Sequence, residues 1–243
     1  MPSVIYTQKG HIARIVLNRP EAGNAINQPM AQGLSEICGQ INRDDDVYVV
    51  VVTGAGDSFC IGSELEPGKY RPAAALAAID RPVIAAIDGG AVGEGLELAL
   101  GCDIRLASSR ARFGLPQVAR GLIPMDGGTQ RLPRIVGRGK ALELLLTAAT
   151  INAQEALEIG LVSRVLPPEK LTDEAEALAE GIAAKGPIAL RYLKEVVNKG
   201  MDMTLEQGLR LEADLYFLLH TTSDRTEGIR AFLEKRKPHF KGE

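Results

Sequence analysis

Aromatic rings are scarce in this chain of 243 residues: there is no tryptophan, and tyrosine and phenylalanine occur five times each. Few side chains are therefore available on which nucleic-acid bases could stack. The 28 lysines and arginines are nearly balanced by 31 aspartates and glutamates, so the chain has no overall positive field to attract a polyanion. We expect no nucleic-acid partner.

Long apolar runs and paired cysteines are also missing. No uninterrupted apolar segment approaches the roughly 18 residues of a membrane span, and Met1–Gly10 lacks the charged and apolar regions of a signal peptide. Cys38, Cys60 and Cys102 are odd in number and include no Cys-x-x-Cys pair, which argues against disulfides and against a zinc site. We expect a cytoplasmic protein that binds neither a membrane nor a metal.

The chain has the composition of an ordinary globular protein, and segments typical of strands, turns and helices alternate regularly along its first half. Apolar residues make up 45% of it and charged residues 24%. In the first half, short β-rich runs alternate with turn residues and amphipathic stretches. We predict strands at residues 4–7, 11–17, 47–53, 83–87 and 103–107, and helices at residues 28–42 and from Glu94 onward. Strand, turn and helix at this interval indicate stacked β-β-α units in an α/β fold.

From about Pro133 the pattern changes to helical periodicity. We predict helices at residues 137–147, 152–158, 171–185, 187–198, 204–220 and 223–235. No linker rich in glycine and serine separates the two halves. We therefore predict a core over residues 1–185 and a helical region over residues 186–243 that packs on the core or on a neighbouring subunit.

The most informative segment is Asp88–Asp103. The run before it, Arg81–Asp88, has the apolar character of a short buried strand. The glycines that follow open a helix, and a helix start leaves backbone N–H groups unpaired. Such donors suit a substrate oxygen on which negative charge develops. Glu97 lies about one helical turn further on, so its carboxyl group can face the same space. The segment predicts an oxyanion site beside one acid/base group.

Further motifs occur in a fixed order along almost the whole chain, and together they resemble the enoyl-CoA hydratase/isomerase (crotonase) superfamily. They are Asn18–Pro20, Asp57–Leu65, Asp88–Asp103, Phe113–Leu132, Gly160–Ser163 and Glu227–Phe240. One such motif is weak, but several in the right order are specific. The resemblance implies a crotonase-like spiral of β-β-α units, a helical C-terminal trimerisation region and homotrimers that often pair into hexamers. It also implies an acyl-CoA thioester substrate and no further cofactor, because the CoA arrives with the substrate.

The same resemblance assigns roles to individual residues. Ser63, just after Gly62, supplies the first backbone donor to the thioester oxygen, and Glu94 supplies the second. Glu97 matches the acid/base glutamate of the hydratases. The positions that approach CoA are Ala22, Gly23, Ala25, Ile61, Gly62 and Leu65, with Phe232 and Lys235 contributed by a neighbouring subunit.

At two positions this chain departs from the hydratase pattern. Hydratases typically carry a second glutamate after the proline of Phe-Gly-x-Pro, and here that position is Gln117. A glutamine can hold a water molecule but cannot exchange protons near neutral pH. Glu94 stands where many relatives have glycine. Its side chain either is solvated or caps the helix, or it replaces the carboxylate that is missing at position 117.

Three more residues carry open alternatives. Asp126, before Gly127 and Gly128, is either a helix N-cap or a carboxylate of the pocket, and the two roles are compatible. Lys69 and Tyr70 follow the first oxyanion segment; they are either solvated or proton donors of the kind that decarboxylating members use.

The sequence thus predicts a hydro-lyase that adds water reversibly to a conjugated acyl-CoA thioester through a stabilised enolate. The catalytic candidates are Glu97, Ser63, Glu94, Gln117 and Asp126. Because Gln117 replaces the second glutamate, dienoyl-CoA hydratase, enoyl-CoA isomerase, acyl-CoA hydrolase and decarboxylase activities remain alternatives. A catalytically weak CoA-binding or RNA-associated subunit is the rival from another class, disfavoured by the lack of a basic stripe.

Overall fold

The main sheet of the computed structural model, which describes residues 1–66 and 68–243, has the strand order β1-β2-β3-β4-β6-β9. β1 (Val4–Lys9) and β2 (Ile12–Leu17) form the predicted hairpin around Gly10. The strands β3 (Val49–Gly54), β4 (Val83–Ile87), β6 (Ile104–Ser108) and β9 (Arg164–Leu166) continue in parallel. β3 and β4 are almost entirely apolar because helices cover both faces of the sheet.

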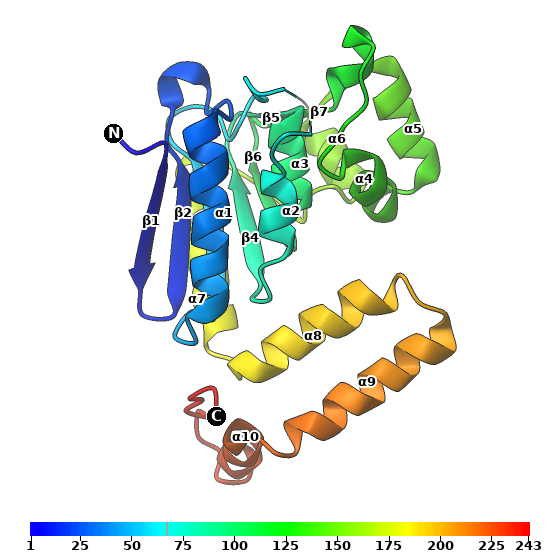
Figure 1. The fold of residues 1–243 in the computed structure, drawn as a ribbon. Coiled ribbons are helices and arrows are strands. Elements are labelled where there is room, and N and C mark those ends of the chain that lie inside the picture. Colours follow the sequence, from blue (N-terminus) through cyan, green and yellow to red (C-terminus); the bar gives the residue numbers. More distant parts are fainter. Residues whose placement is uncertain (67) are drawn as a thin grey trace.

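The two faces of the sheet carry separate layers of core. On one face lie α1 (Gln28–Arg43), α2 (Pro72–Ala77) and α3 (Glu94–Leu100), and on the other lies α7 (Pro168–Ala183) (Figure 1). Alternate residues of β3 serve the two layers: Val50 and Val52 belong to the larger cluster, while Val49 and Val51 pack with the α7 residues.

A second, smaller sheet crosses the end of the first and carries the turns that matter for function. It contains β5 (Gly90–Val92), β7 (Arg112–Gly114) and β8 (Thr150–Asn152). A bridge between Cys60 and Ala91 adds the segment after β3 to its edge. Each turn of the chain therefore runs from a strand of the large sheet to the small sheet and on to a helix. This is the spiral of β-β-α units that the sequence predicted, and the prediction is confirmed.

Helices make up most of the chain after β7. Besides α7, they are η2 (Pro116–Arg120), α4 (Gly128–Val136), α5 (Arg138–Thr147), α6 (Ala153–Glu158), α8 (Pro187–Gly200), α9 (Leu205–Leu219) and α10 (Ser223–Leu233). α8, α9 and α10 extend away from the sheets (Figure 1). The predicted division at residues 185 and 186 falls in the connection between α7 and α8, and it stays a prediction. Among the described residues, no helix combines the length and apolarity needed to cross a bilayer.

Candidate active site

Two glycine bends lie side by side at the edge of the small sheet. The N–H of Cys60 donates to the carbonyl of Gly90 (2.9 Å), and the N–H of Val92 donates to the carbonyl of Cys60 (3.0 Å). Because Cys60 pairs in parallel with Ala91, the same register places residue 62 beside residue 93 and residue 63 beside residue 94. Each bend has a positive φ that favours glycine, +132° at residue 62 and +60° at residue 93.

The residue after each bend presents a free backbone donor. Within the described residues, neither the N–H of Ser63 nor that of Glu94 has a hydrogen-bond acceptor. Glu94 is the first residue of α3, where no intrahelical acceptor exists and where the helix dipole is positive. Two adjacent, unpaired N–H groups form a site for an oxygen that carries negative charge.

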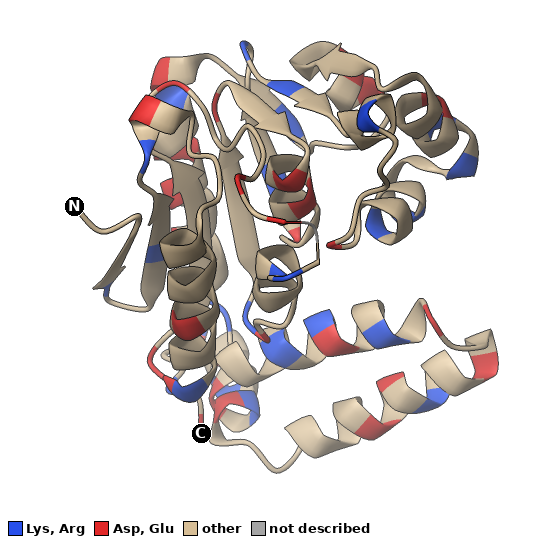
Figure 2. Cartoon of the chain, turned by 45° about the horizontal axis from the view of Figure 1, so that its top comes forward, with Lys and Arg blue, Asp and Glu red and all other residues tan. Residues whose placement is uncertain are grey.

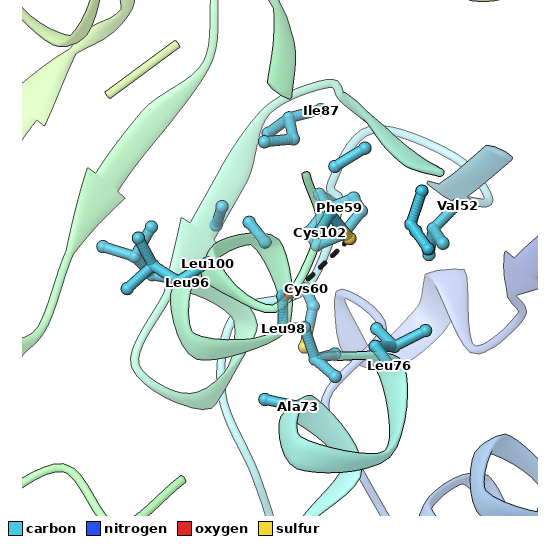
Figure 3. Packing of buried hydrophobic residues seen from close by; sticks show 14 of the residues in the cluster. Val52, Phe59, Cys60, Ala73, Leu76, Ile87, Leu96, Leu98, Leu100 and Cys102 are labelled. Carbon is cyan, nitrogen blue, oxygen red and sulfur yellow. Dashed lines mark hydrogen bonds between the residues drawn. The ribbon is translucent and has the colours of Figure 1, made fainter. Parts of the chain in front are cut away.

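The start of α3 is held in place by close packing. A Cβ atom on Gly95 would overlap the carbonyl oxygen of Cys60, so only glycine allows the helix to approach the first bend this closely. Leu96 and Leu98 are buried, and Figure 3 shows them with Phe59 and with apolar residues of α2 around the same helix. The packing therefore fixes the Glu94 end of α3 against the Cys60 segment.

Glu97 lies inside this packing with its side chain only 1% exposed. Its Oε1 atom accepts the N–H groups of Asp126 (2.7 Å) and Gly128 (2.8 Å). Its Oε2 atom is buried and has no partner among the described residues. Burial raises the pKa of the Glu97 carboxyl group, the neighbouring carboxylates of Asp126 and Glu94 raise it further, and the two N–H bonds oppose the rise. One oxygen is thus fixed, and the other is available to exchange a proton.

Several of the predicted site residues line one small cavity. It has a volume of about 30 Å³, about that of one water molecule. Its polar lining includes Ser63, Glu94, Glu97 and Asp126, and Leu65 is among its apolar residues. A larger cavity of about 690 Å³ lies between α8 and the core, and no catalytic candidate lines it. The sequence prediction had singled out each of the five residues named here, and the fold brings them together.

The Glu94 side chain faces this cavity. Its Oε2 atom is 3.6 Å from the position that a Cβ atom would occupy on Gly62. The side chain is half-buried and lines the same cavity as Glu97. Of the two alternatives left open by the sequence, the geometry therefore favours a carboxyl group inside the site over one that is only solvated.

Gln117 lies on η2 beside the second bend. It is 9% exposed, and its Nε2 atom is 3.7 Å from the position of a Cβ atom on Gly93. Neither its amide oxygen nor its amide nitrogen has a partner among the described residues. Leaving a buried amide unpaired costs about 1–3 kcal/mol, so such a group is ready to bind a polar ligand or a water molecule.

Asp126 is a helix cap, but of a different helix from the one the sequence suggests. Its carboxylate accepts the N–H groups of Ala73 (2.6 Å) and Ala74 (3.1 Å), at the start of α2. The N-cap position of α4, the helix that follows Asp126 in the chain, is Gly127. The sequence analysis did not predict α2, although Pro72 followed by three alanines is a recognisable helix start.

The candidates for CoA contact fall into two groups, one beside the first glycine bend and one at the C-terminal helices. Gly23 lies against the first bend, because its carbonyl accepts the N–H of Ile61 (3.1 Å) and its Cα packs under the Ile61 side chain. Ala22 and Ala25 flank Gly23 in the chain. By contrast, Phe232 and Lys235 lie in and just after α10, which Figure 1 places away from α3 of the same chain.

Tyr70 lines the cavity, and the Nζ atom of Lys69 lies 5.9 Å from the centre of its ring. A phenol and an ammonium group are thus near the reacting space. Met125, next to Asp126, also lines the cavity and was not among the predicted site residues.

Comparisons with known proteins show which proteins this chain is similar to. The model of the family "Enoyl-CoA hydratase/isomerase" matches residues 7–243. A crotonyl-CoA hydratase of Syntrophomonas wolfei is 41% identical over 98% of this chain and 97% of its own length. An (E)-benzylidenesuccinyl-CoA hydratase of Thauera aromatica is 41% identical over 96% of both chains. A solved structure of an enoyl-CoA hydratase from Bacillus anthracis has a TM-score of 0.95 at 40% identity, covering 99% of this chain and 100% of that one.

Proposed function

The chain belongs to the enoyl-CoA hydratase/isomerase family and is an enzyme of that family, and we propose that it adds water reversibly to the conjugated C=C bond of an enoyl-CoA thioester. The observation that carries the proposal is the buried carboxyl group of Glu97: its Oε2 has no partner among the described residues, and Glu97 lines the same cavity as Ser63 and Glu94. The hydratase names of similar proteins support the same reaction.

The first part of the mechanism is stabilisation of charge on the thioester oxygen. This oxygen accepts hydrogen bonds from the N–H groups of Ser63 and Glu94. As water attacks the β-carbon, the π electrons of the C=C bond move toward the carbonyl and give an enolate. Each well-placed donor contributes about 3 kcal/mol to stabilising that charge.

The second part is proton transfer by Glu97. The Oε2 atom takes one proton from the water as the hydroxyl group bonds to the β-carbon. The protonated carboxyl group then gives that proton to the α-carbon, and the enolate returns to the thioester. The pKa of Glu97, raised by burial, brings the carboxyl group closer to the range in which it can both accept and donate a proton. Because one group serves both carbons, hydrogen and hydroxyl add to the same face.

Gln117 and Glu94 assist this reaction in different ways. The unpaired amide of Gln117 accepts the other hydrogen of the attacking water and so orients it. Glu94, which lines the same cavity as Glu97, takes the place of the second glutamate of other hydratases. Glu97 nevertheless remains the main acid and base, because it alone is buried with one oxygen held by two N–H groups.

We also propose that the enzyme assembles as a homotrimer or hexamer and that the adenine end of CoA lies along Ala22, Gly23 and Ala25. Large apolar side chains are exposed along the C-terminal helices, and Phe232 is 82% exposed; the other such residues include Leu193, Val197, Met201, Leu205, Phe217 and Leu233. Exposed apolar surface of this extent indicates a protein interface. Charged residues of both signs occur on α8 and on α9 (Figure 2).

Two measurements test the proposal. Addition of the protein to crotonyl-CoA should remove the absorbance of the conjugated thioester, and the product should be the 3-hydroxyacyl ester. Tight binding of the CoA ester without any change of absorbance, for crotonyl and longer enoyl groups alike, would contradict the hydratase function. Light scattering should give three or six times the chain mass of 26.0 kDa, and a monomer would contradict the assembly.

A further inference from the structure

Asp126 makes contacts with three different elements around the active site. Its carboxylate accepts the N–H groups of Ala73 and Ala74 in α2. Its backbone N–H donates to Oε1 of Glu97 in α3 (2.7 Å), and its carbonyl accepts Nη1 of Arg131 in α4 (2.7 Å). The side chain is only 7% exposed, so these bonds are shielded from water.

The start of α2 has no side-chain cap of its own. The residue at its N-cap position, Arg71, makes no side-chain hydrogen bond to the helix. Asp126, more than 50 residues further along the chain, is the side chain that accepts the first N–H groups of α2. A carboxylate in this place also complements the positive end of the helix.

The chain just before α2 forms one wall of the cavity. Leu65 and Tyr70 lie in that segment, and Pro72 is the first residue of α2; all three line the cavity. A displacement of α2 therefore displaces the wall against which an acyl group would lie. The same cavity is lined by Glu97, whose fixed oxygen is held by the backbone of Asp126 and of Gly128.

We propose that Asp126 is a positioning residue: its side chain anchors the segment that holds Oε1 of Glu97 to the start of α2, and thereby fixes the direction of Oε2 relative to the acyl wall. The proposal rests on the hydratase function proposed above. Asp126 itself need not exchange protons with the substrate, because both of its carboxylate oxygens are already bonded to backbone N–H groups.

The test begins with Asp126→Ala and Asp126→Asn, assayed at saturating enoyl-CoA. Asp126→Ala should lower kcat about ten- to hundredfold, the range typical of losing a residue that orients a reactive group. Asp126→Asn keeps one acceptor oxygen and should recover part of that loss. Hydrogen exchange of peptides that contain Ala73 and Ala74 should be faster in Asp126→Ala, which reports the lost cap without any reference to catalysis.

Asp224 provides a matched control. It is 6% exposed and accepts two consecutive backbone N–H groups, those of Lys241 (2.7 Å) and Gly242 (2.9 Å). Asp224→Ala should lower the melting temperature but leave kcat at the wild-type value. An equal loss of kcat in Asp224→Ala and Asp126→Ala would overturn the proposal, since general destabilisation would then explain both.

A double-mutant cycle with Glu97→Gln separates positioning from other effects. If Asp126 acts through Glu97, then Asp126→Ala should have little further effect on the residual rate of Glu97→Gln. A loss as large in that background as in the wild type would overturn the proposal, as would wild-type kcat in Asp126→Ala. Wild-type protein without activity on any enoyl-CoA would instead contradict the hydratase function, and the exchange experiment would still report the cap.

Discussion

Replacement of Glu97 by glutamine should abolish turnover while leaving the fold intact. The amide oxygen of the new side chain can occupy the place of Oε1 and accept the N–H groups of Asp126 and Gly128, which now lie 2.7 and 2.8 Å from it. The amide nitrogen then occupies the place of Oε2, which has no partner among the described residues. Geometry is preserved, and only the ability to exchange a proton is lost.

The expected loss of activity follows from that single change. Acid/base catalysis by one positioned group contributes about 10²–10⁴-fold, and Glu97 serves both carbons of the substrate. We expect kcat to fall at least about 10³-fold, which corresponds to about 4 kcal/mol of transition-state stabilisation. Binding of the CoA ester should change little, because the backbone donors of Ser63 and Glu94 remain. The surface variant Glu143→Gln, which removes an exposed carboxylate paired with Lys140, is the control and should retain full activity.

The stability of Glu97→Gln should move in the opposite direction from its activity. Burial raises the pKa of Glu97 in the folded protein above the ordinary 4.5 of the unfolded chain. Between pH 4.5 and the raised pKa, the folded protein therefore binds more protons than the unfolded chain. The free energy of unfolding of the wild type therefore falls as pH rises through this window, and above it the carboxylate carries its full burial cost. Glutamine removes that cost, so the variant should melt at the wild-type temperature or higher at neutral pH. Full activity of Glu97→Gln, or a melting temperature several degrees lower at neutral pH, would refute this reasoning.

Two more predictions concern the site, and a third concerns a buried arginine of the core. Gln117→Glu places a second carboxyl group beside the second bend, and kcat on crotonyl-CoA should rise about tenfold; a fall in kcat with unchanged binding would count against the assigned role. In the wild type, kcat/KM for hydration should fall as pH decreases through the raised pKa of Glu97, so a profile that stays flat down to pH 4.5 would be inconsistent with a buried base. Arg81 is buried and donates to the carbonyls of Val47 (3.1 Å) and Asp44 (2.9 Å), so Arg81→Ala should reduce the free energy of unfolding by about 3 kcal/mol; an unchanged urea midpoint would disprove this.

The parts of the fold that sequence reasoning predicted are those set by local pattern. The hairpin around Gly10, the strand at Val83–Ile87 and the helix that begins at Glu94 all occur where the pattern placed them. The strands β5, β7 and β8 have three residues each and were not predicted. Such short strands form because of the partners they meet, and the identity of those partners is not a local property of the sequence.

The candidate site shows the same division. The local pattern of Asp88–Asp103 predicted unpaired N–H groups at a helix start and an acidic residue, Glu97, one turn further on, because these features depend on neighbours in the chain. The assignment of Ser63 and Glu94 as the two donors came from the family resemblance. The bond from Asp126 to α2 joins residues more than 50 positions apart, and nothing near Asp126 in the sequence indicates it. Similarly, the free oxygen of Glu97 is defined by which of its two oxygens the backbone of Asp126 and Gly128 holds.

A crystal structure with a bound, unreactive acyl-CoA tests the central claim most directly. The account predicts that the thioester oxygen lies about 2.7–3.1 Å from the backbone nitrogens of both Ser63 and Glu94. It also predicts that Oε2 of Glu97 points at the two reacting carbons, or at a water molecule beside them. A thioester oxygen bound elsewhere, or a Glu97 side chain turned away from the acyl group, would contradict it.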